Sequence, residues 1–246
     1  MRRGIDTTHM MVYGHEAWVV TDKSVYAPGE EVCAIMRWGH HMRPDGFFRL
    51  DEIRVFVQDE AGNRIAITPV KGPGDEMGDY YELRFTPTST GIHTIMAIYD
   101  NNYVRNEKDE YFEGDRRTYP DILDAKNYPQ IYETCITVGE KRGTIDFIHE
   151  SRVSFIPKPW EADTDVLHLC LIHDKFPVKG ASVCVVCYDG NEYFERFLNT
   201  DENGEIFFNT EKKGIYMAVT RKPLAEGIEG IYDSKEIAST FTYVKR

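Results

Sequence analysis

The stretches Glu16-Ala-Trp-Val-Val-Thr21 and Val32-Cys-Ala-Ile-Met-Arg-Trp38 decide the fold of this chain. Both are short runs of the β-branched, aromatic and aliphatic residues that favour extended strands. Between them lies Ala27-Pro-Gly-Glu30, in which proline and glycine occupy the central positions of a type II turn. A hairpin centred on that turn would place His15 opposite Met42 and within two positions of His40.

The same pattern continues along the rest of the chain. Short apolar segments, several of them alternating with period two, are separated by turn residues such as Asp201-Glu-Asn-Gly204. In the first half these segments cover residues 53–58, 64–70, 80–86, 92–99 and 131–138. In the second half they cover residues 145–149, 166–172, 182–188, 192–198, 205–209, 215–221 and 236–244. The sequence therefore predicts an all-β protein.

The predicted strands fall into two groups, each of the size of an Ig-like sandwich. We therefore expect two tandem Ig-like β-sandwich domains, residues 12–139 and 144–246, joined by the polar, glycine-flanked stretch 139–143. The first domain contains a long polar loop, residues 101–130, with several tyrosines and a short helix expected over residues 120–126. Ordered loops of this length are usually functional.

The N-terminus has a different character from the rest of the first domain. Residues 1–11, which end in His-Met-Met, have the appearance of a vector or leader remnant that replaces a removed signal peptide. We therefore expect a periplasmic or otherwise extracytoplasmic location. No apolar run approaches the roughly eighteen residues of a membrane helix, so no membrane insertion of the mature chain is expected.

Composition and motifs limit the classes of function. The chain has 29 Lys and Arg against 41 Asp and Glu, a net charge of −12, which argues against nucleic acid as a partner. The sequence carries none of the usual hydrolase, zinc-protease or nucleotide-binding motifs, so no enzyme is predicted. Five cysteines form no disulfide framework. Cys184 and Cys187 are three apart on a predicted strand and should face opposite sides.

One group of histidines stands out as a candidate metal site. His15 precedes the first predicted strand, and His40 and His41 follow the second, with Met42 adjacent. Imidazole is a good ligand for nickel, copper and zinc, so two imidazoles at one edge of a sheet would suit a transition metal. Glu16 or a water could complete the coordination shell. The alternative is that these are exposed loop histidines without a metal.

Several short motifs occur in a recognisable order. His15-Glu-Ala-Trp18, Pro28-Gly-Glu-Glu-Val32 and Gly39-His-His-Met42 follow one another in the first half. Phe176-Pro-Val-Lys-Gly-Ala-Ser-Val183 and Thr200-Asp-Glu-Asn-Gly-Glu-Ile206 in the second half are similar to the hairpins of transthyretin-like and carboxypeptidase-regulatory-like Ig domains. Together these elements resemble periplasmic accessory components of nickel/cobalt uptake transporters, a family catalogued mainly as a domain of unknown function.

This resemblance implies a soluble extracytoplasmic protein that handles Ni²⁺ or Co²⁺ and passes the ion to a membrane transporter component. It implies that His15 and His40 are the paired ligands, and that His41, which stands where relatives often have proline, is an additional or replacement ligand. Some relatives carry a further histidine near the end of the first domain. This chain has Ile131-Tyr-Glu-Thr-Cys135 there instead.

Two other functions remain as alternatives to nickel or cobalt handling. A tandem Ig-like envelope module would bind a protein or glycan partner through the tyrosines of residues 101–130, since tyrosine gives a large amphipathic contact area. A copper carrier would use the same histidines with Met42 and Met36 as thioether ligands.

Overall fold

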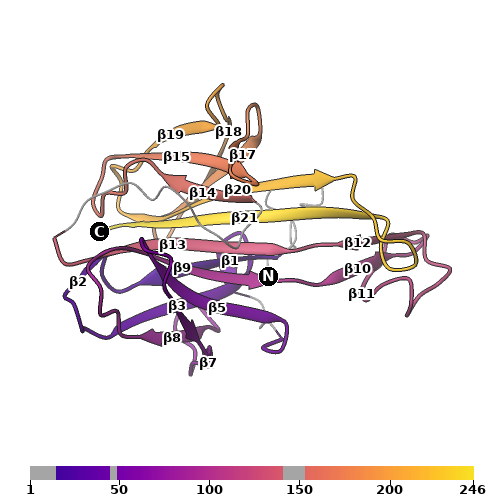
Figure 1. The fold of residues 1–246 in the computed structure, drawn as a ribbon, viewed down its shortest axis with the longest axis horizontal. Helices are drawn as coiled ribbons and strands as arrows, with labels where there is room; N and C mark the ends of the chain where they lie inside the picture. The colour runs from indigo at the N-terminus through magenta and orange to yellow at the C-terminus, as the bar shows by residue number, and fades with distance from the viewer. Residues whose placement is uncertain (1–14, 45–48, 141–152) are drawn as a thin grey trace.

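The computed structural model describes residues 15–44, 49–140 and 153–246 (Figure 1). All regular elements in these ranges are β-strands, which confirms the predicted all-β fold with Ig-like sandwiches. No helix long and apolar enough to cross a membrane occurs in the described parts of the chain. The expected remnant at residues 1–11, the strand at 145–149 and most of the 139–143 link lie outside the described residues.

The N-terminal sandwich consists of two sheets. The first contains, in spatial order, β1 (Glu16–Thr21), β3 (Val32–His40), β8 (Tyr81–Phe85) and β7 (Val70–Lys71), with β4 (Arg43–Pro44) paired to β3. The second contains β6 (Arg64–Ile67), β5 (Ile53–Asp59), β9 (Gly91–Tyr99) and β13 (Gln130–Val138), with β2 (Val25–Tyr26) paired to β13. Their facing sides enclose one apolar core.

A proline explains one difference from the predicted strands. Residues 64–70 were expected to form a single strand but form β6 and β7, which belong to different sheets. Pro69 lies between them, and a proline has no N–H with which to continue the hydrogen-bond ladder. The chain therefore crosses from one sheet to the other at this point.

The C-terminal sandwich also consists of two layers. One contains β14 (Val153–Pro157), β15 (Val166–His173) and β16 (Phe176–Pro177), with β19 (Glu205–Asn209) paired to β15. The other contains β18 (Tyr193–Asn199), β17 (Ser182–Tyr188), β20 (Gly214–Leu224) and β21 (Ser234–Lys245). The sequence pattern missed β14, which is short and is followed by a second proline at residue 159.

The two sandwiches share a sheet through β21. This strand pairs with β20 from Lys235 to Lys245, and its residues 238–242 also pair, in parallel, with residues 130–134 of β13. Figure 1 shows β21 running between the strands of the two halves. As a result β9 and β13 are buried on both faces, and every residue of these two strands is buried.

The apolar clusters reflect this shared sheet. One face of β9 and β13 contributes to the N-terminal core, and the other face packs into the C-terminal core. A third cluster joins Trp18 and Met42 of the N-terminal half to Cys184, Met217 and neighbouring residues of the C-terminal half. Cys184 lies in this third cluster whereas Cys187 packs against the C-terminal core, so the two cysteines face opposite sides as predicted.

Residues 101–130 form a projecting finger rather than a structureless loop (Figure 1). The finger contains β10 (Asn102–Arg105), β11 (Tyr111–Glu113) and β12 (Asp124–Asn127), and β12 pairs with the start of β21. The helix expected over residues 120–126 is wrong, because part of that range belongs to β12. Arg116 fixes the finger to the C-terminal half: its Nε and Nη2 donate to the two carboxylate oxygens of Asp233 at 2.7 and 2.6 Å.

Candidate functional site

The β1–β3 hairpin brings His15 and His40 together. Glu16 pairs with Gly39, so the register continued by one residue places His15 opposite His40 rather than opposite Met42. The expected register was wrong by two positions because the hairpin is not centred on the Ala27–Glu30 turn: β2 leaves β1 to join the other sheet. The two imidazole rings lie with centroids 4.0 Å apart and planes tilted by 52°.

A tryptophan supports this histidine pair from the same face of the hairpin. The ring of Trp38 stacks on His15 with centroids 3.7 Å apart and an interplanar angle of 14°. Trp38 packs in turn against the N-terminal core, which also includes Ala17. The pair therefore lies at the rim of a rigid core, and both histidines are partly exposed to solvent. Such support limits the rotation of the His15 ring.

His41 and Met42 form the two-residue turn between β3 and β4. Both have positive φ values, 51° and 58°, as a type I′ turn requires, although neither is the glycine or asparagine that such turns favour. This conformation costs roughly 1–2 kcal/mol per residue. Burial of Met42, which is 1% exposed within the third cluster, offsets part of that cost.

The structure does not place His41 with the other two histidines as a third ligand. Its Nδ1 lies 3.3 Å from the Tyr193 hydroxyl, and the two rings meet edge to face with centroids 5.4 Å apart. Burial lowers the pKa of His41, which favours its neutral form. His41 thus belongs to a contact between the turn and β18.

Glu16 forms a buried ion pair with Arg221. Arg221 Nη2 of β20 donates to Glu16 Oε1 at 3.0 Å, and the side chains are only 5% and 2% exposed. Because successive side chains of a strand point to opposite faces, Glu16 faces the C-terminal half while His15 faces the N-terminal core. The Glu16 carboxylate, which was expected to be a further metal ligand, therefore holds the two halves together.

The remaining candidate ligands are buried in apolar surroundings. Met36 lies in the N-terminal core and is fully buried, as Met42 is in the third cluster. Tyr132 faces the N-terminal core, whereas Cys135 belongs to the C-terminal core on the other face of β13. Among the described residues no cluster of three His, Cys, Asp or Glu side chains could hold a metal.

Glu133, also on β13, is fully buried at the seam between the sandwiches. Ser154 Oγ donates to its Oε1 at 2.6 Å, and the Phe155 N–H donates to its Oε2 at 3.2 Å. Burial raises the pKa of this carboxyl to about 8, despite these two donors. Glu133 is therefore mainly protonated at neutral pH and stabilises the seam as a neutral group.

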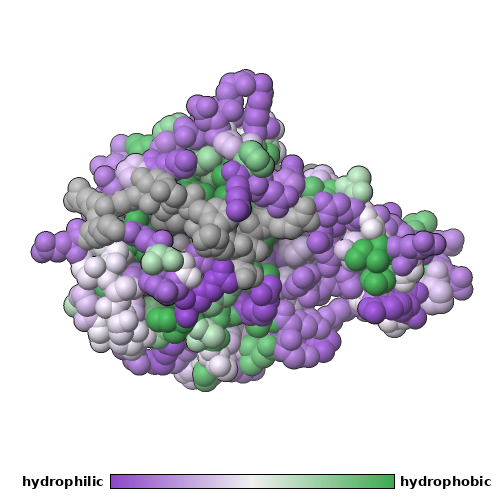
Figure 2. Space-filling model, in the orientation of Figure 1, coloured by the Kyte–Doolittle hydropathy of each residue, from purple (hydrophilic) through white to green (hydrophobic). Residues whose placement is uncertain are grey.

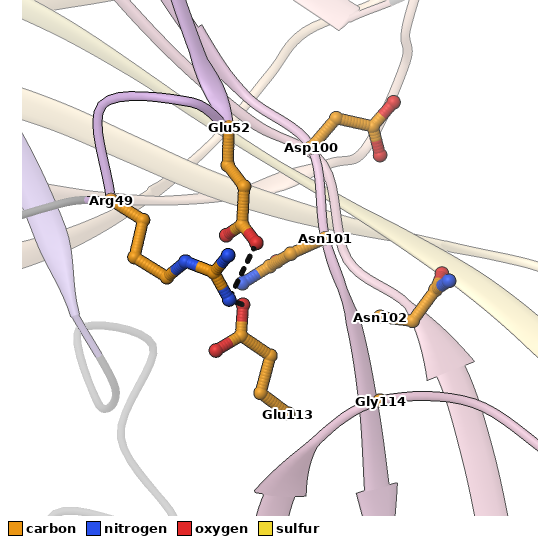
Figure 3. A pocket seen from close by; sticks show the side chains of 7 residues that line it. All are labelled: Arg49, Glu52, Asp100, Asn101, Asn102, Glu113 and Gly114. Atoms are coloured by element: carbon orange, nitrogen blue, oxygen red, sulfur yellow. Dashed lines mark ion pairs between the residues drawn. The ribbon is translucent and has the colours of Figure 1, made fainter. Parts of the chain in front are cut away.

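A second feature is a cleft of about 370 Å³ at the base of the finger (Figure 3). It is formed by Arg49 and Glu52 before β5, Asn101 between β9 and β10, and Glu113 and Gly114 at the end of β11. Sequence analysis missed it because its residues come from three separate segments and form no motif. The one signal was the unusual length and polarity of residues 101–130.

Two linked sandwiches with a histidine pair at one rim define the structural class of this molecule as an all-β, Ig-like protein. The chain belongs to the family described as "Domain of unknown function (DUF4198)", whose sequence profile matches residues 12–222. That description names no metal and no transport role. No curated protein matches the sequence.

Solved structures give only distant likenesses. A DUF4785 family protein from Legionella pneumophila has a TM-score of 0.30 at 10% identity, over 88% of this chain and 53% of that chain. Escherichia coli alpha-2-macroglobulin has a TM-score of 0.27 at 13% identity, over 95% and 20%. A two-domain fibronectin type-III segment of chicken tenascin has 0.22 at 10%, over 92% and 97%. This chain spans about half the Legionella protein, and likenesses of this size carry no functional information.

Proposed function

We propose that this protein binds one nickel or cobalt ion through His15 and His40 and delivers it, outside the cytoplasm, to a membrane transporter. The observation that carries the proposal is the 4.0 Å separation of the two ring centroids. An ion bonded at about 2.0–2.1 Å to one nitrogen of each ring leaves the centroids roughly 4–5 Å apart when the two bonds are nearly perpendicular. The separation of the two rings is therefore compatible with one ion bound to both.

The chemistry of the donors suits the proposed cargo. Imidazole is a borderline ligand that prefers nickel, copper, cobalt and zinc to hard ions such as magnesium or calcium. Two protein ligands with the other positions held by water give an ion that can be released, which a delivery protein requires. The net charge of −12 favours the approach of cations. The motif resemblance to accessory proteins of nickel/cobalt uptake supports the same assignment.

Calorimetric titration with Ni²⁺ or Co²⁺ tests this proposal directly. The native protein should bind one ion, and His15→Ala and His40→Ala should each lower the affinity at least tenfold, or about 1.4 kcal/mol, because each removes one of two imidazoles. His41→Ala should have a much smaller effect, since its ring contacts Tyr193.

His173→Ala is a matched control, because it removes a partly exposed histidine at the end of β15. Its affinity should equal that of the native protein. If neither ion binds at micromolar concentration, or if His15→Ala binds as tightly as the native chain, the proposal is wrong. Preference for Cu(I) over Ni²⁺ in competition would assign the histidines to copper instead.

A further inference from the structure

The cleft at the base of the finger contains a buried amide without a partner. Asn101 is only 7% exposed, and among the described residues neither its Nδ2 nor its Oδ1 has a hydrogen-bond partner. Figure 3 shows the Asn101 side chain directed into the cleft, toward the space beside Arg49 and Glu113. Leaving a buried amide unpaired costs about 1–3 kcal/mol. Such a cost is expected where a ligand supplies the missing bonds.

The side chains of Asp100 and Asn102, on either side of Asn101, do have hydrogen-bond partners. Asn127 Nδ2 donates to Asp100 Oδ1 at 3.0 Å and to Asn102 Oδ1 at 3.0 Å, so both flanking side chains are engaged. In Figure 3 these two side chains point away from the centre of the cleft. Burial raises the pKa of the Tyr103 hydroxyl. The nearby Asn101 amide lowers this pKa, but the two groups do not meet in normal hydrogen-bond geometry.

Two carboxyl groups face Asn101 across the cleft. Glu52 is held from behind, because the Tyr99 hydroxyl donates to its Oε2 at 2.9 Å. Arg49 Nη1 lies 3.1 Å from Glu52 and 3.7 Å from Glu113, so its guanidinium bridges the pair. Burial and the proximity of Glu52 raise the pKa of Glu113. Arg49 is 57% exposed, so it can shift to admit a ligand without disturbing the core.

These groups restrict the chemistry of a ligand. An amide presents an NH₂ donor group and a carbonyl acceptor side by side, and the carboxylates beside it accept. A hydroxyl group can accept from the amide and donate to a carboxylate at the same time, whereas a bare cation cannot accept from the amide. An anionic ligand would be repelled by Glu52 and Glu113. A ligand with neighbouring hydroxyl groups fits this set best.

Two aromatic rings of the finger lie close to Gly114, at the edge of the cleft. Gly114 has a φ of 141°, and a Cβ there would lie 2.8 Å from Cε2 of Tyr119, so the tyrosine ring rests on this glycine. Phe112 stacks with Tyr119 at a centroid distance of 6.2 Å, and the two are 41% and 37% exposed. The rest of the finger is mainly hydrophilic on the face seen in Figure 2. Neither ring lines the cleft itself.

We propose that this cleft binds a saccharide, with Asn101 and Glu113 holding a pair of neighbouring hydroxyl groups. Its volume of about 370 Å³ lies at the lower end of the range of small-molecule sites and has room for one or two sugar rings. The site is independent of the histidine pair, which uses other residues on β1 and β3.

Ligand-observed NMR with glucose, galactose, mannose, N-acetylglucosamine, maltotriose and chitotriose tests the proposal on the full chain. At least one sugar should bind the native protein. Asn101→Asp removes the amide donor and Glu113→Gln removes a carboxylate acceptor, and each should weaken that binding about tenfold or more. Tighter binding of a trisaccharide than of its single sugar would identify a glycan chain as the source, and equal binding a free sugar. Either result supports the proposal.

Glu110→Gln is the matched control, because Glu110 lies on the same finger but accepts from Asn106 Nδ2 at 2.8 Å outside the cleft. It should bind sugar as the native protein does. Circular dichroism should give native spectra for all variants, and Glu113→Gln, at an exposed residue, provides the test if Asn101→Asp does not fold. Absence of binding by every sugar up to about 10 mM, a weaker limit than ordinary specific binding, would overturn the proposal. Calcium binding that the same variants abolish, without sugar binding, would also overturn it.

Discussion

Glu133→Gln should have a free energy of unfolding that no longer falls as the pH rises from about 4.5 to about 8. In the native protein the buried carboxyl keeps its proton until about pH 8, whereas in the unfolded chain it loses that proton above its ordinary pKa of 4.5. Between these values the unfolded state releases a proton that the folded state retains. Raising the pH therefore favours unfolding of the native chain and not of the variant.

The expected effect is large. The native chain should lose on the order of 4 kcal/mol relative to Glu133→Gln across this range, since each unit of pKa shift corresponds to about 1.4 kcal/mol. Glutamine matches the protonated carboxyl in shape. It can accept from the Phe155 N–H with its oxygen and donate to Ser154 Oγ with its nitrogen. At pH 4.5 and below, the two proteins should therefore be similarly stable.

Urea unfolding at half-unit pH intervals provides the measurement. Glu107→Gln, which changes an exposed glutamate of the finger, is the control and should follow the native pH dependence. If the native and Glu133→Gln curves stay parallel from pH 5 to pH 8, Glu133 is ionised in the folded protein and its role as a neutral seam group is wrong.

Arg221→Met should lower the free energy of unfolding by about 3–5 kcal/mol, because it leaves the Glu16 carboxylate buried without its guanidinium. The double variant Glu16→Met with Arg221→Met should recover most of that loss. Replacing a whole buried ion pair by apolar residues of similar size is often neutral or stabilising. The difference in the free energy of unfolding between the single and the double variant gives the cost of leaving the Glu16 carboxylate buried without a partner.

Lys179→Met is the matched control for an exposed pair. Lys179 Nζ lies 2.6 Å from Glu202 Oε2, but the side chains are 64% and 77% exposed. Solvent screens such a pair, so its loss should cost less than about 1 kcal/mol. Equal losses from Lys179→Met and Arg221→Met in chemical unfolding would contradict the special role of the buried pair.

Local sequence pattern was enough to find most strands but not to assign them to sheets. The strands of residues 16–21, 182–188 and 205–209 have the predicted bounds, because alternation and turn residues act over short distances. The parallel pairing of β21 with β13 joins residues about a hundred positions apart, and no local pattern encodes such a partner. No local pattern indicates that β2 pairs with β13 in the second sheet either. This is why the predicted register of the β1–β3 hairpin was wrong by two positions.

The histidine pair was accessible to sequence analysis because both residues flank one hairpin. His15 and His40 meet as expected, although His41 contacts Tyr193 across the two sandwiches. The role of Glu16 could not be foreseen, since its partner Arg221 is remote in sequence. Asn101 gave no signal either, because an asparagine is an ordinary loop residue until its burial is known.

The position of β21 has a consequence for biosynthesis. On the ribosome β13 emerges well before β21, so for that interval one edge of β13 has no neighbour and its apolar residues are uncovered. An unpaired apolar strand edge is a site at which chains associate with one another. Until the strand that completes both sandwiches is in place, this edge of β13 is therefore where we expect association with another chain.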